Sequence, residues 1–270
     1  MQSAELIMLG TGNAMVTHCY NTCFLLRLAG GDYFLTDAGG GNGILGRLEE
    51  ARIDYDKFHY MFVTHGHTDH VIGVLWVIRK IASLMAAGKY NGDFHIYCHD
   101  VVKHILLTMA GLMLKKKDAA FLGQRIYLHE IHHGETVSFL GLKLTAFDIF
   151  STKAKQFGYR LRLPDGTVFV CLGDEPYNER DKEYAQQADW LLSEAFCLYE
   201  DRDIFHPYEK HHSTVKEAAE TASQLDARHL LLYHTEETHL PERKQLYTAE
   251  AGHYYTGPVY VPDDMEHITL

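Results

Sequence analysis

The sequence predicts an α/β fold in one domain, residues 1–270. Short apolar stretches of strand length alternate with longer stretches whose apolar residues recur at helical spacing. A chain of 270 residues with 46% hydrophobic residues is within the size range of a single α/β domain. The sequence contains no low-complexity segment, internal repeat or linker. One domain is therefore the simplest interpretation.

The first third of the chain predicts four strands and two helices. "ELIMLG" at 5–10 is a short apolar strand, and "NTCFLLRLAGGDYFLTDAGGG" at 21–41 predicts two strands around a Gly-Gly-Asp turn. "GILGRLEEAR" at 43–52 predicts a short helix, and "HYMFVT" at 59–64 a buried strand. Apolar residues then recur with helical spacing through 68–89, and we expect Thr68 or Asp69 to be the N-cap of that helix.

The rest of the chain predicts a β-rich middle and a closing β/α alternation. "FHIYC" at 94–98 is a strand, and a helix is expected from about Asp100 to Lys117. Residues 125–174 predict five strands, with a turn at "PDG", 164–166. A strand in 189–196, a helix in 213–225 and a strand in 229–235 follow, and the tail ends in "GPVYVPDD".

Charge and cysteine content narrow the class of protein. Lys+Arg 25 against Asp+Glu 36 gives a net charge of −11, which repels phosphate backbones and anionic lipid and weakens a nucleic-acid or membrane function. Five cysteines without a CxxC pair are typical of free thiols in a reducing compartment. No apolar stretch reaches 18 residues. We therefore expect a cytoplasmic protein that does not enter a membrane.

The stretch "THGHTDH", residues 64–70, has the composition of a metal site. His65 and His67 are two positions apart, so in an extended chain both imidazoles point to the same side. Asp69 and His70 follow where the chain turns into the helix. Imidazole and carboxylate ligands suit zinc, iron or manganese. A solvated polar loop is the alternative, but the position between a buried strand and an amphipathic helix favours a metal.

This motif resembles the HxHxDH signature of the metallo-β-lactamase fold superfamily. "LGTGNA" with "DAGGG", then "CLGD" and "LLYHTEE", are similar to further segments of that superfamily and occur in the same order. Within it, ribonuclease Z is the nearest resemblance, because "FGYR", "LLSEAF" and "HHSTVKEAAETA" followed by "HLLLYH" have counterparts there. The resemblance spans nearly the whole chain. It implies a four-layer αββα sandwich of two mixed β-sheets flanked by helices.

The resemblance also implies a metal-dependent hydrolase with two divalent metal ions. His65 and His67 would bind the first ion; Asp69, His70 and His234 would bind the second. Asp174 would bridge the two ions together with a water. Zinc is the first choice for both ions, with manganese and iron as alternatives.

Three residues are implied as catalytic. Asp69 would orient the bridging hydroxide, and His212 matches a ribonuclease Z histidine that contacts the scissile phosphate and helps to protonate the leaving group. Glu194 would support His212. The alternatives are a solvent-facing histidine at a helix start and a second-layer or surface acid. His211 would take the catalytic place if the register shifted by one residue.

One departure from the family concerns the first metal. The family has a third histidine shortly before "GYR", but residues 148–160 contain no histidine, and Phe150 or Thr152 occupies the expected place. Strand alternation would put Asp148 on the same face as Phe150, so Asp148 is a further candidate ligand; an ordinary strand-end carboxylate is the alternative. His132 and His133 are expected to be solvated. We expect the first metal to be weakly bound or absent.

A second departure concerns the substrate. Ribonuclease Z has a long tRNA-gripping arm between "GYR" and "GD", whereas here only 13 residues, 161–173, separate these motifs. We therefore expect hydrolysis of a phosphodiester or other ester in a small molecule, with nucleic acid as a less favoured partner. The alternatives are a tRNA 3′-end-processing endonuclease and a metal-binding module with little catalysis. A homodimer is a further open alternative.

Overall fold

The computed structural model describes residues 3–270, and its contacts divide the chain into two compact units. The first unit comprises the residues up to Gly10, Tyr20–Ile131 and Asp263–Leu270. The second comprises Thr11–Cys19 and His132–Pro262. The interpretation as one domain remains a prediction.

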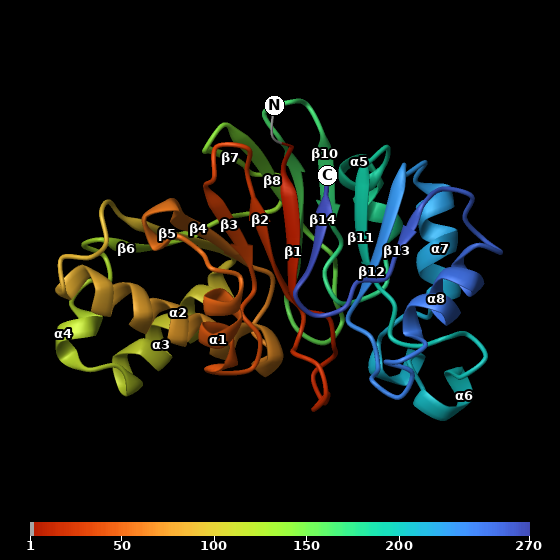
Figure 1. The fold of residues 1–270 in the computed structure, drawn as a ribbon, viewed down its shortest axis with the longest axis horizontal. Coiled ribbons are helices and arrows are strands. Elements are labelled where there is room, and N and C mark those ends of the chain that lie inside the picture. The colour runs from red at the N-terminus through yellow and green to blue at the C-terminus, as the bar shows by residue number, and fades with distance from the viewer. Residues whose placement is uncertain (1–2) are drawn as a thin grey trace. The chain divides into compact units, whose positions relative to one another are not determined.

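The first unit contains a mixed sheet of seven strands in the order β14-β1-β2-β3-β4-β5-β6 (Figure 1). The pairs from β14 to β3 are antiparallel, and the pairs from β3 to β6 are parallel. The strands are β1 (Glu5–Gly10), β2 (Cys23–Arg27), β3 (Tyr33–Thr36), β4 (Phe58–Val63), β5 (Phe94–Cys98), β6 (Ile126–Glu130) and β14 (Glu266–Thr269). The parallel strands all end at the same edge, and the loops that follow β3 and β4 carry the histidine motif and its neighbours.

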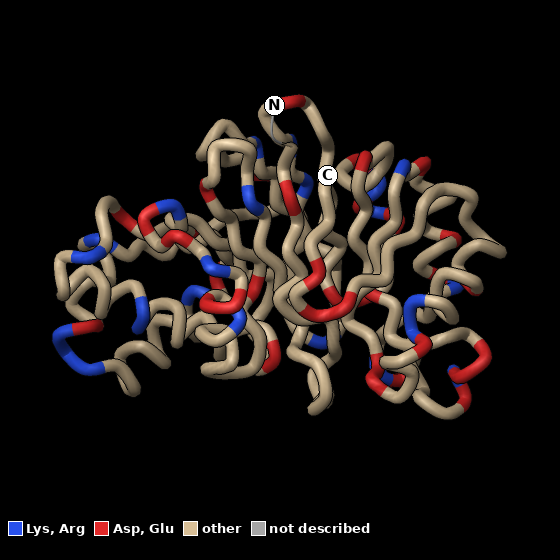
Figure 2. Tube along the Cα trace, viewed as in Figure 1, with Lys and Arg blue, Asp and Glu red and all other residues tan. Residues whose placement is uncertain are grey.

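The helices of this unit bury their apolar sides against the sheet. They are α1 (Gly43–Glu50), α2 (Thr68–Ala86), α3 (Asp100–Met113) and α4 (Lys116–Ala119). Side chains of α1, α2 and α3 share one hydrophobic core with β1 to β6. The helix expected from Asp100 to Lys117 is interrupted, because Leu114 and Lys115 have extended ψ angles. Figure 2 shows the short basic run at α4.

The second unit contains the other mixed sheet, in the order β13-β12-β11-β10-β9-β8-β7. Here the pairs from β13 to β10 are parallel and those from β10 to β7 antiparallel. The strands are β7 (Thr136–Phe139), β8 (Leu142–Asp148), β9 (Phe157–Arg162), β10 (Val168–Cys171), β11 (Trp190–Glu194), β12 (His229–Tyr233) and β13 (Val259–Tyr260). The predicted turn at 164–166 joins β9 to β10, with Gly166 at φ +97°.

Short helices flank this second sheet. They are α5 (Lys182–Ala185), α6 (Arg202–Phe205), α7 (Val215–Gln224) and α8 (Arg243–Ala251), and α7 and α8 pack on β11 and β12 through one hydrophobic core. A capping box between Thr214 and Glu217 fixes the start of α7. Two mixed seven-stranded sheets with flanking helices confirm the predicted fold class.

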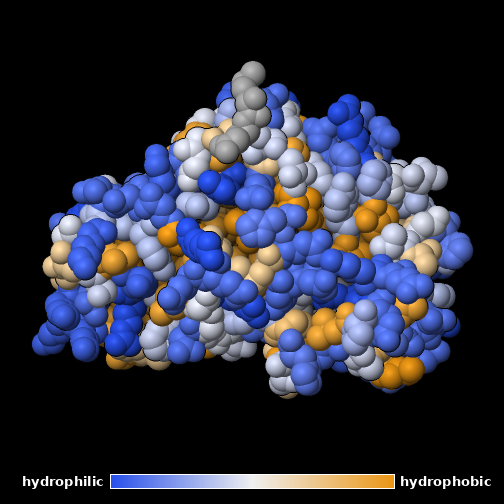
Figure 3. All heavy atoms as spheres, in the orientation of Figure 1, coloured by the Kyte–Doolittle hydropathy of each residue, from blue (hydrophilic) through white to orange (hydrophobic). Residues whose placement is uncertain are grey.

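Exposed apolar side chains are scattered rather than continuous on the face drawn in Figure 3. The most exposed large ones are Met15 at 85% and Leu112 at 82%. Within residues 3–270, no helix has both the length and the apolar character needed to cross a membrane.

Candidate active site

The first unit holds the four residues of the histidine motif between the end of β4 and the first turn of α2. β4 ends at Val63, and His65 follows it, whereas Asp69 and His70 lie in the first turn of α2. The structure begins α2 at Thr68 with His67 as the N-cap residue. The predicted N-cap was therefore one or two residues too late, because His67 keeps an extended backbone and its ring faces His65 instead of capping the helix.

Within this motif, two pairs of possible metal-ligand atoms lie close together. His65 Nε2 lies 2.8 Å from His67 Nδ1, with the two rings at 84°. His70 Nε2 lies 3.2 Å from Asp69 Oδ2. Two ligand atoms at right angles on one ion, each about 2.0–2.1 Å from it, are about 3 Å apart. Both pairs therefore have the separation that adjacent ligands of one metal ion require.

Asp37, which follows β3, organises these ligands. Its Oδ1 accepts a hydrogen bond from the Thr64 backbone N–H at 2.8 Å, and its Oδ2 accepts from Thr64 Oγ1 at 2.7 Å and from His70 Nδ1 at 2.8 Å. Because the Thr64 hydroxyl donates to Asp37, its oxygen accepts from His65 Nδ1 at 3.0 Å. Both histidines are thereby held with the proton on Nδ1, which leaves Nε2 deprotonated for a metal.

Asp37 is a residue of the candidate site that sequence reasoning missed. It is 3% exposed and has φ +54°, a left-handed conformation that a non-glycine residue rarely adopts. The loop after it is held against α2, because Gly73 N–H donates to Gly39 O at 2.8 Å. The available signal was the "DAGGG" segment, which resembles a segment of the metallo-β-lactamase fold superfamily and contains this aspartate.

The second unit places three candidate residues at the ends of adjacent parallel strands. Asp174 follows β10, Glu194 ends β11, and His234 follows β12 with φ +58°. The Tyr233 hydroxyl donates to the Gly173 carbonyl and so ties the turns after β10 and β12 together. His234 Nε2 lies 3.5 Å from Asp174 Oδ2. This pair also has a separation compatible with ligands of one ion.

His212 lies beside this pair, in the segment that leads into α7. Its ring centroid is 5.1 Å from that of His234, and its Nδ1 is 3.6 Å from Glu194 Oε2. Glu194, His212 and His234 are all buried and close enough to form a metal-competent group. Burial, with the nearby His234 as a second cause, lowers the pKa of His212 to about 3. Burial raises the pKa of Glu194 well above its ordinary value.

In the segment expected to supply a third histidine, the candidate ligands make local contacts instead. β8 ends at Asp148, and Phe150 has φ +58°, so the predicted strand alternation does not reach Phe150. Asp148 Oδ1 accepts from the Phe150 N–H at 2.8 Å, which supports the strand-end alternative for this carboxylate. Among residues 3–270, no metal-competent group includes Asp148. Thr152 Oγ1 lies 2.8 Å from His211 Nδ1 instead.

Two side-chain contacts made by this segment were not expected from the sequence. Gln156, 1% exposed, donates from Nε2 to Asp174 Oδ1, the predicted bridging carboxylate. Ser151 Oγ donates to Glu175 Oε1 at 2.7 Å. His133 is exposed as expected, although its Nδ1 accepts from the Asp148 N–H at 3.0 Å. An amide side chain thus lies against Asp174, a contact that could not be expected from the sequence.

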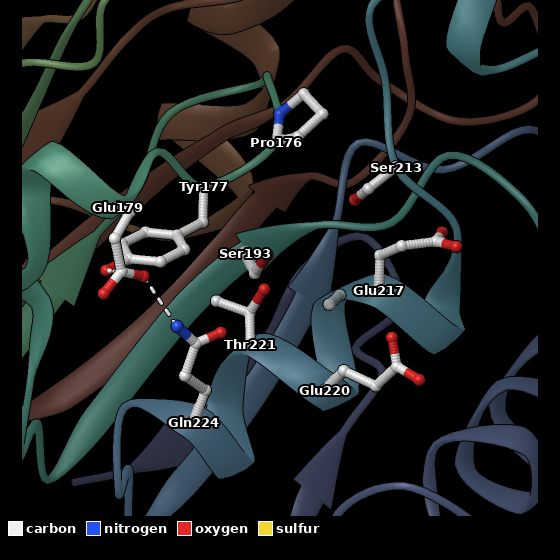
Figure 4. Close-up of a pocket in the computed structure, with 10 residues that line it drawn as sticks. Pro176, Tyr177, Glu179, Ser193, Ser213, Glu217, Glu220, Thr221 and Gln224 are labelled. Carbon is white, nitrogen blue, oxygen red and sulfur yellow. Dashed lines mark hydrogen bonds between the residues drawn. The ribbon is translucent and has the colours of Figure 1, made fainter.

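A cavity of about 350 Å³ lies in the same unit, lined by one side of α7 and by the 176–179 segment (Figure 4). Its glutamates already have partners. Gln224 Nε2 donates to Glu179 Oε2 at 2.6 Å, and Glu217 accepts from the Thr214 N–H in the capping box and from the Tyr208 hydroxyl. Ser193 and Ser213 at its wall both donate to the Glu194 carbonyl. Both glutamates and both serines are therefore engaged by partners within the protein.

Comparisons with known proteins agree with this architecture. Ribonuclease Z from Thermococcus sibiricus is 26% identical over an alignment of 318 positions, covering 98% of this chain and 96% of that protein. The metallo-β-lactamase fold protein YhfI from Bacillus subtilis superposes with a TM-score of 0.78 at 17% identity, covering 99% of both chains. The short form of human tRNase Z, ELAC1, gives 0.77 at 19% identity, covering 98% of both chains.

These likenesses confirm the predicted resemblance to ribonuclease Z and a hydrolase of the metallo-β-lactamase fold. A family model narrows the assignment. The model described as "Anti-Pycsar protein Apyc1" matches residues 4–253, which is nearly the whole chain. The chain therefore belongs to the Anti-Pycsar protein Apyc1 family.

Proposed function

We propose that the protein is a metal-dependent phosphodiesterase acting on a small phosphodiester. Its metal ligands come from both strand-end sets, as the resemblance to ribonuclease Z implies: His65 and His67 for one ion, Asp69, His70 and His234 for a second, with Asp174 bridging. Bound divalent cations there would lower the pKa of a shared water and stabilise negative charge on phosphoryl oxygens. Zinc is the first choice, and manganese and iron remain alternatives.

The observation that carries the proposal is the buried group of Glu194, His212 and His234. A metal held only for structure needs no histidine beside its ligands that is paired with a buried acid. His212 is such a residue, since its Nδ1 faces Glu194 Oε2 at 3.6 Å. Glu194 positions the His212 ring, and the ring would donate a proton to a leaving oxygen.

Two chain residues complete the proposed chemistry. Asp69 orients the attacking water through its carboxylate, and its place in the first turn of α2 holds it there. Asp37 keeps His65 and His70 in the ligand tautomer. Both assignments rest on contacts within the first unit and on the resemblance to ribonuclease Z.

Hydrolysis of bis-p-nitrophenyl phosphate with added zinc or manganese tests the proposal. We expect turnover that His67→Ala abolishes and that His104→Ala leaves unchanged, because His104 is an exposed histidine on α3. No turnover of any phosphodiester, carboxylic ester or thioester would refute the enzyme and favour a metal-binding module.

The similarity to ribonuclease Z keeps a second candidate, a tRNA 3′-end endonuclease. The hairpin of β9 and β10 leaves no room for a gripping arm at that place, because only five residues separate the two strands. A gel assay with precursor tRNA distinguishes the candidates. Cleavage at the discriminator base would favour the tRNA endonuclease over the phosphodiesterase that acts on a small molecule.

We also propose that the first ion is held more weakly than the second. Asp148 and Thr152, the candidate replacements for the missing ligand, each have a local partner, the Phe150 N–H and His211 Nδ1. Metal content of protein purified without added metal tests this. Two tightly held equivalents would contradict it.

A further inference from the structure

Two histidines on neighbouring strands of the first sheet bring ring nitrogens into contact outside the candidate active site. His95 lies on β5, and His129 lies on the parallel strand β6 at the edge of that sheet (Figure 1). His95 Nδ1 lies 2.9 Å from His129 Nε2. His95 is in register with Tyr60 on β4, five positions before His65. The pair is therefore separate from the histidine motif that follows β4.

The sequences of the two strands place both histidines on one face of the sheet. In "FHIYC", His95 and Tyr97 share a face of β5; in "IYLHE", Tyr127 and His129 share a face of β6. The residues between them pack into the hydrophobic core on the other face. The register sets His95 opposite Tyr127. It sets His129 opposite Tyr97, so the two histidines are diagonal neighbours.

Tyrosine rings hold both imidazoles in place. The His95 ring stacks between Tyr60, with centroids 5.1 Å and planes 19° apart, and Tyr127, at 5.6 Å and 15°. The His129 ring stacks on Tyr97 at 5.0 Å and 26°. Because these rings are already ordered by packing on strands, they lose little side-chain freedom when they bind a ligand.

The surroundings of the pair are compatible with a bound cation. Both imidazoles are partly exposed, so an ion can reach them. Lys103 lies near His129 but is paired with Glu130 at 3.4 Å, and the Asp93 carboxylate favours positive charge at His95. Burial lowers the pKa of both histidines, which favours the neutral imidazole that binds metals.

We propose that His95 and His129 form a further metal site, the β5–β6 site, which binds one copper(II) or nickel(II) ion. Two nitrogens about 2.0–2.1 Å from one ion are about 2.9 Å apart at a right angle and about 3.4 Å apart at the tetrahedral angle. The observed 2.9 Å fits adjacent positions of a square-planar or octahedral ion, the geometry typical of these two metals. Water would fill the remaining positions.

Binding at the β5–β6 site requires only a change of tautomer. In the metal-free pair, one neutral ring donates its N–H to the nitrogen of the other. On metal binding, that proton moves to the far nitrogen of the same ring, and both facing nitrogens then present a lone pair to the ion. The site does not depend on the proposed hydrolase activity.

Calorimetric titration with Ni²⁺ tests the site on protein whose candidate active site is first loaded with zinc. We expect one Ni²⁺ per chain without release of zinc, which a chromogenic chelator reports. His129→Phe keeps a ring on Tyr97 but removes the nitrogen. It should lower the Ni²⁺ affinity more than about tenfold, because even loss of a partner that supports a ligand costs about 10–100-fold. His104→Ala, at an exposed histidine on α3, is the control and should bind Ni²⁺ like the wild type.

Three results would overturn the proposal: no Ni²⁺ uptake, uptake only in step with zinc release, or unchanged affinity in His129→Phe. His95→Ala is a second variant with the same expected loss, and melting temperatures in chelator show which variants keep the fold. Excess Ni²⁺ should raise the melting temperature of the wild type, because the ion binds the folded chain, and should leave that of His129→Phe unchanged. At equal free concentrations, nickel should occupy the pair in preference to zinc; the reverse order would refute the right-angled geometry.

Discussion

Replacing Asp37 by asparagine should weaken metal binding without unfolding the protein. The carboxylate accepts three hydrogen bonds, one on Oδ1 and two on Oδ2. An amide of the same shape supplies one acceptor and one donor group. With the amide oxygen facing the Thr64 N–H, its NH₂ faces the Thr64 hydroxyl and His70 Nδ1. His70 must then accept at Nδ1 and carry its proton on Nε2, where a metal would bind.

The other orientation of the amide is no better. If its oxygen faces His70, its NH₂ meets the backbone N–H of Thr64, and two donors oppose each other in a buried site. The hydroxyl of Thr64 also loses its charged acceptor, so the tautomer of His65 is no longer fixed. Mutations of such supporting partners typically cost 10–100-fold in metal affinity, which is about 1.4–2.7 kcal/mol. We expect a loss of stability of about 1–2 kcal/mol, from one or two charged hydrogen bonds partly replaced.

Zinc titration against a chromogenic chelator measures this effect on the wild type and on Asp37→Asn. The matched control is Asp226→Asn, because Asp226 is also a left-handed aspartate, with φ +53°, but is exposed. The control should bind zinc like the wild type. Unchanged zinc affinity in Asp37→Asn would show that the tautomers of His65 and His70 are not set by this carboxylate, and the reasoning would fail.

Two further predictions concern stability. A Cβ at Gly73 would lie 1.8 Å from the Ala38 carbonyl oxygen, so Gly73→Ala should lower the free energy of unfolding, measured in urea, by about 3 kcal/mol. The control is Gly46→Ala on α1, where a Cβ meets open space; it should raise the free energy of unfolding by about 0.5–1 kcal/mol. Burial, with Asp148 as a second cause, raises the pKa of Asp181 to about 7. The folded state thus retains a proton that the unfolded chain releases above about pH 4, and stability falls from there to pH 7. Asp181→Asn should remove this fall, so its melting temperature relative to wild type should rise between pH 5 and 7; a constant difference would contradict the assignment.

The repeating patterns of the sequence were sufficient to predict most strands and longer helices. Apolar spacing predicted α2, and glycine turns predicted the two hairpins at 31 and 166. β14 was missed because "EHIT" alternates weakly and becomes a strand only by pairing with β1. α8 was missed because its stretch is mostly polar, and tertiary packing of Tyr247 and Ala251 stabilises it.

Local sequence could indicate which residues bind a metal but not how they are oriented. His65, His67, Asp69 and His70 are close in sequence, so their spacing was informative. The acceptor that orients His65 and His70 is Asp37, which lies 33 positions before His70 and reaches it only because β3 and β4 are parallel neighbours. The same holds for Gln156 and Asp174, on segments that β9 and β10 bring together.

The missing histidine shows where strand alternation fails to predict a replacement ligand. Alternation along β8 suggested that Asp148 could approach the position left by the missing ligand, but alternation holds only while the backbone remains extended. Phe150 leaves the extended region at φ +58°, and the Asp148 carboxylate accepts the Phe150 N–H across that turn. An aspartate two residues before a left-handed residue is itself a turn signal, so the strand-end interpretation had a physical basis that the alternation argument ignored. A ligand proposed by strand alternation should therefore be tested first against the nearest backbone N–H that its carboxylate can accept.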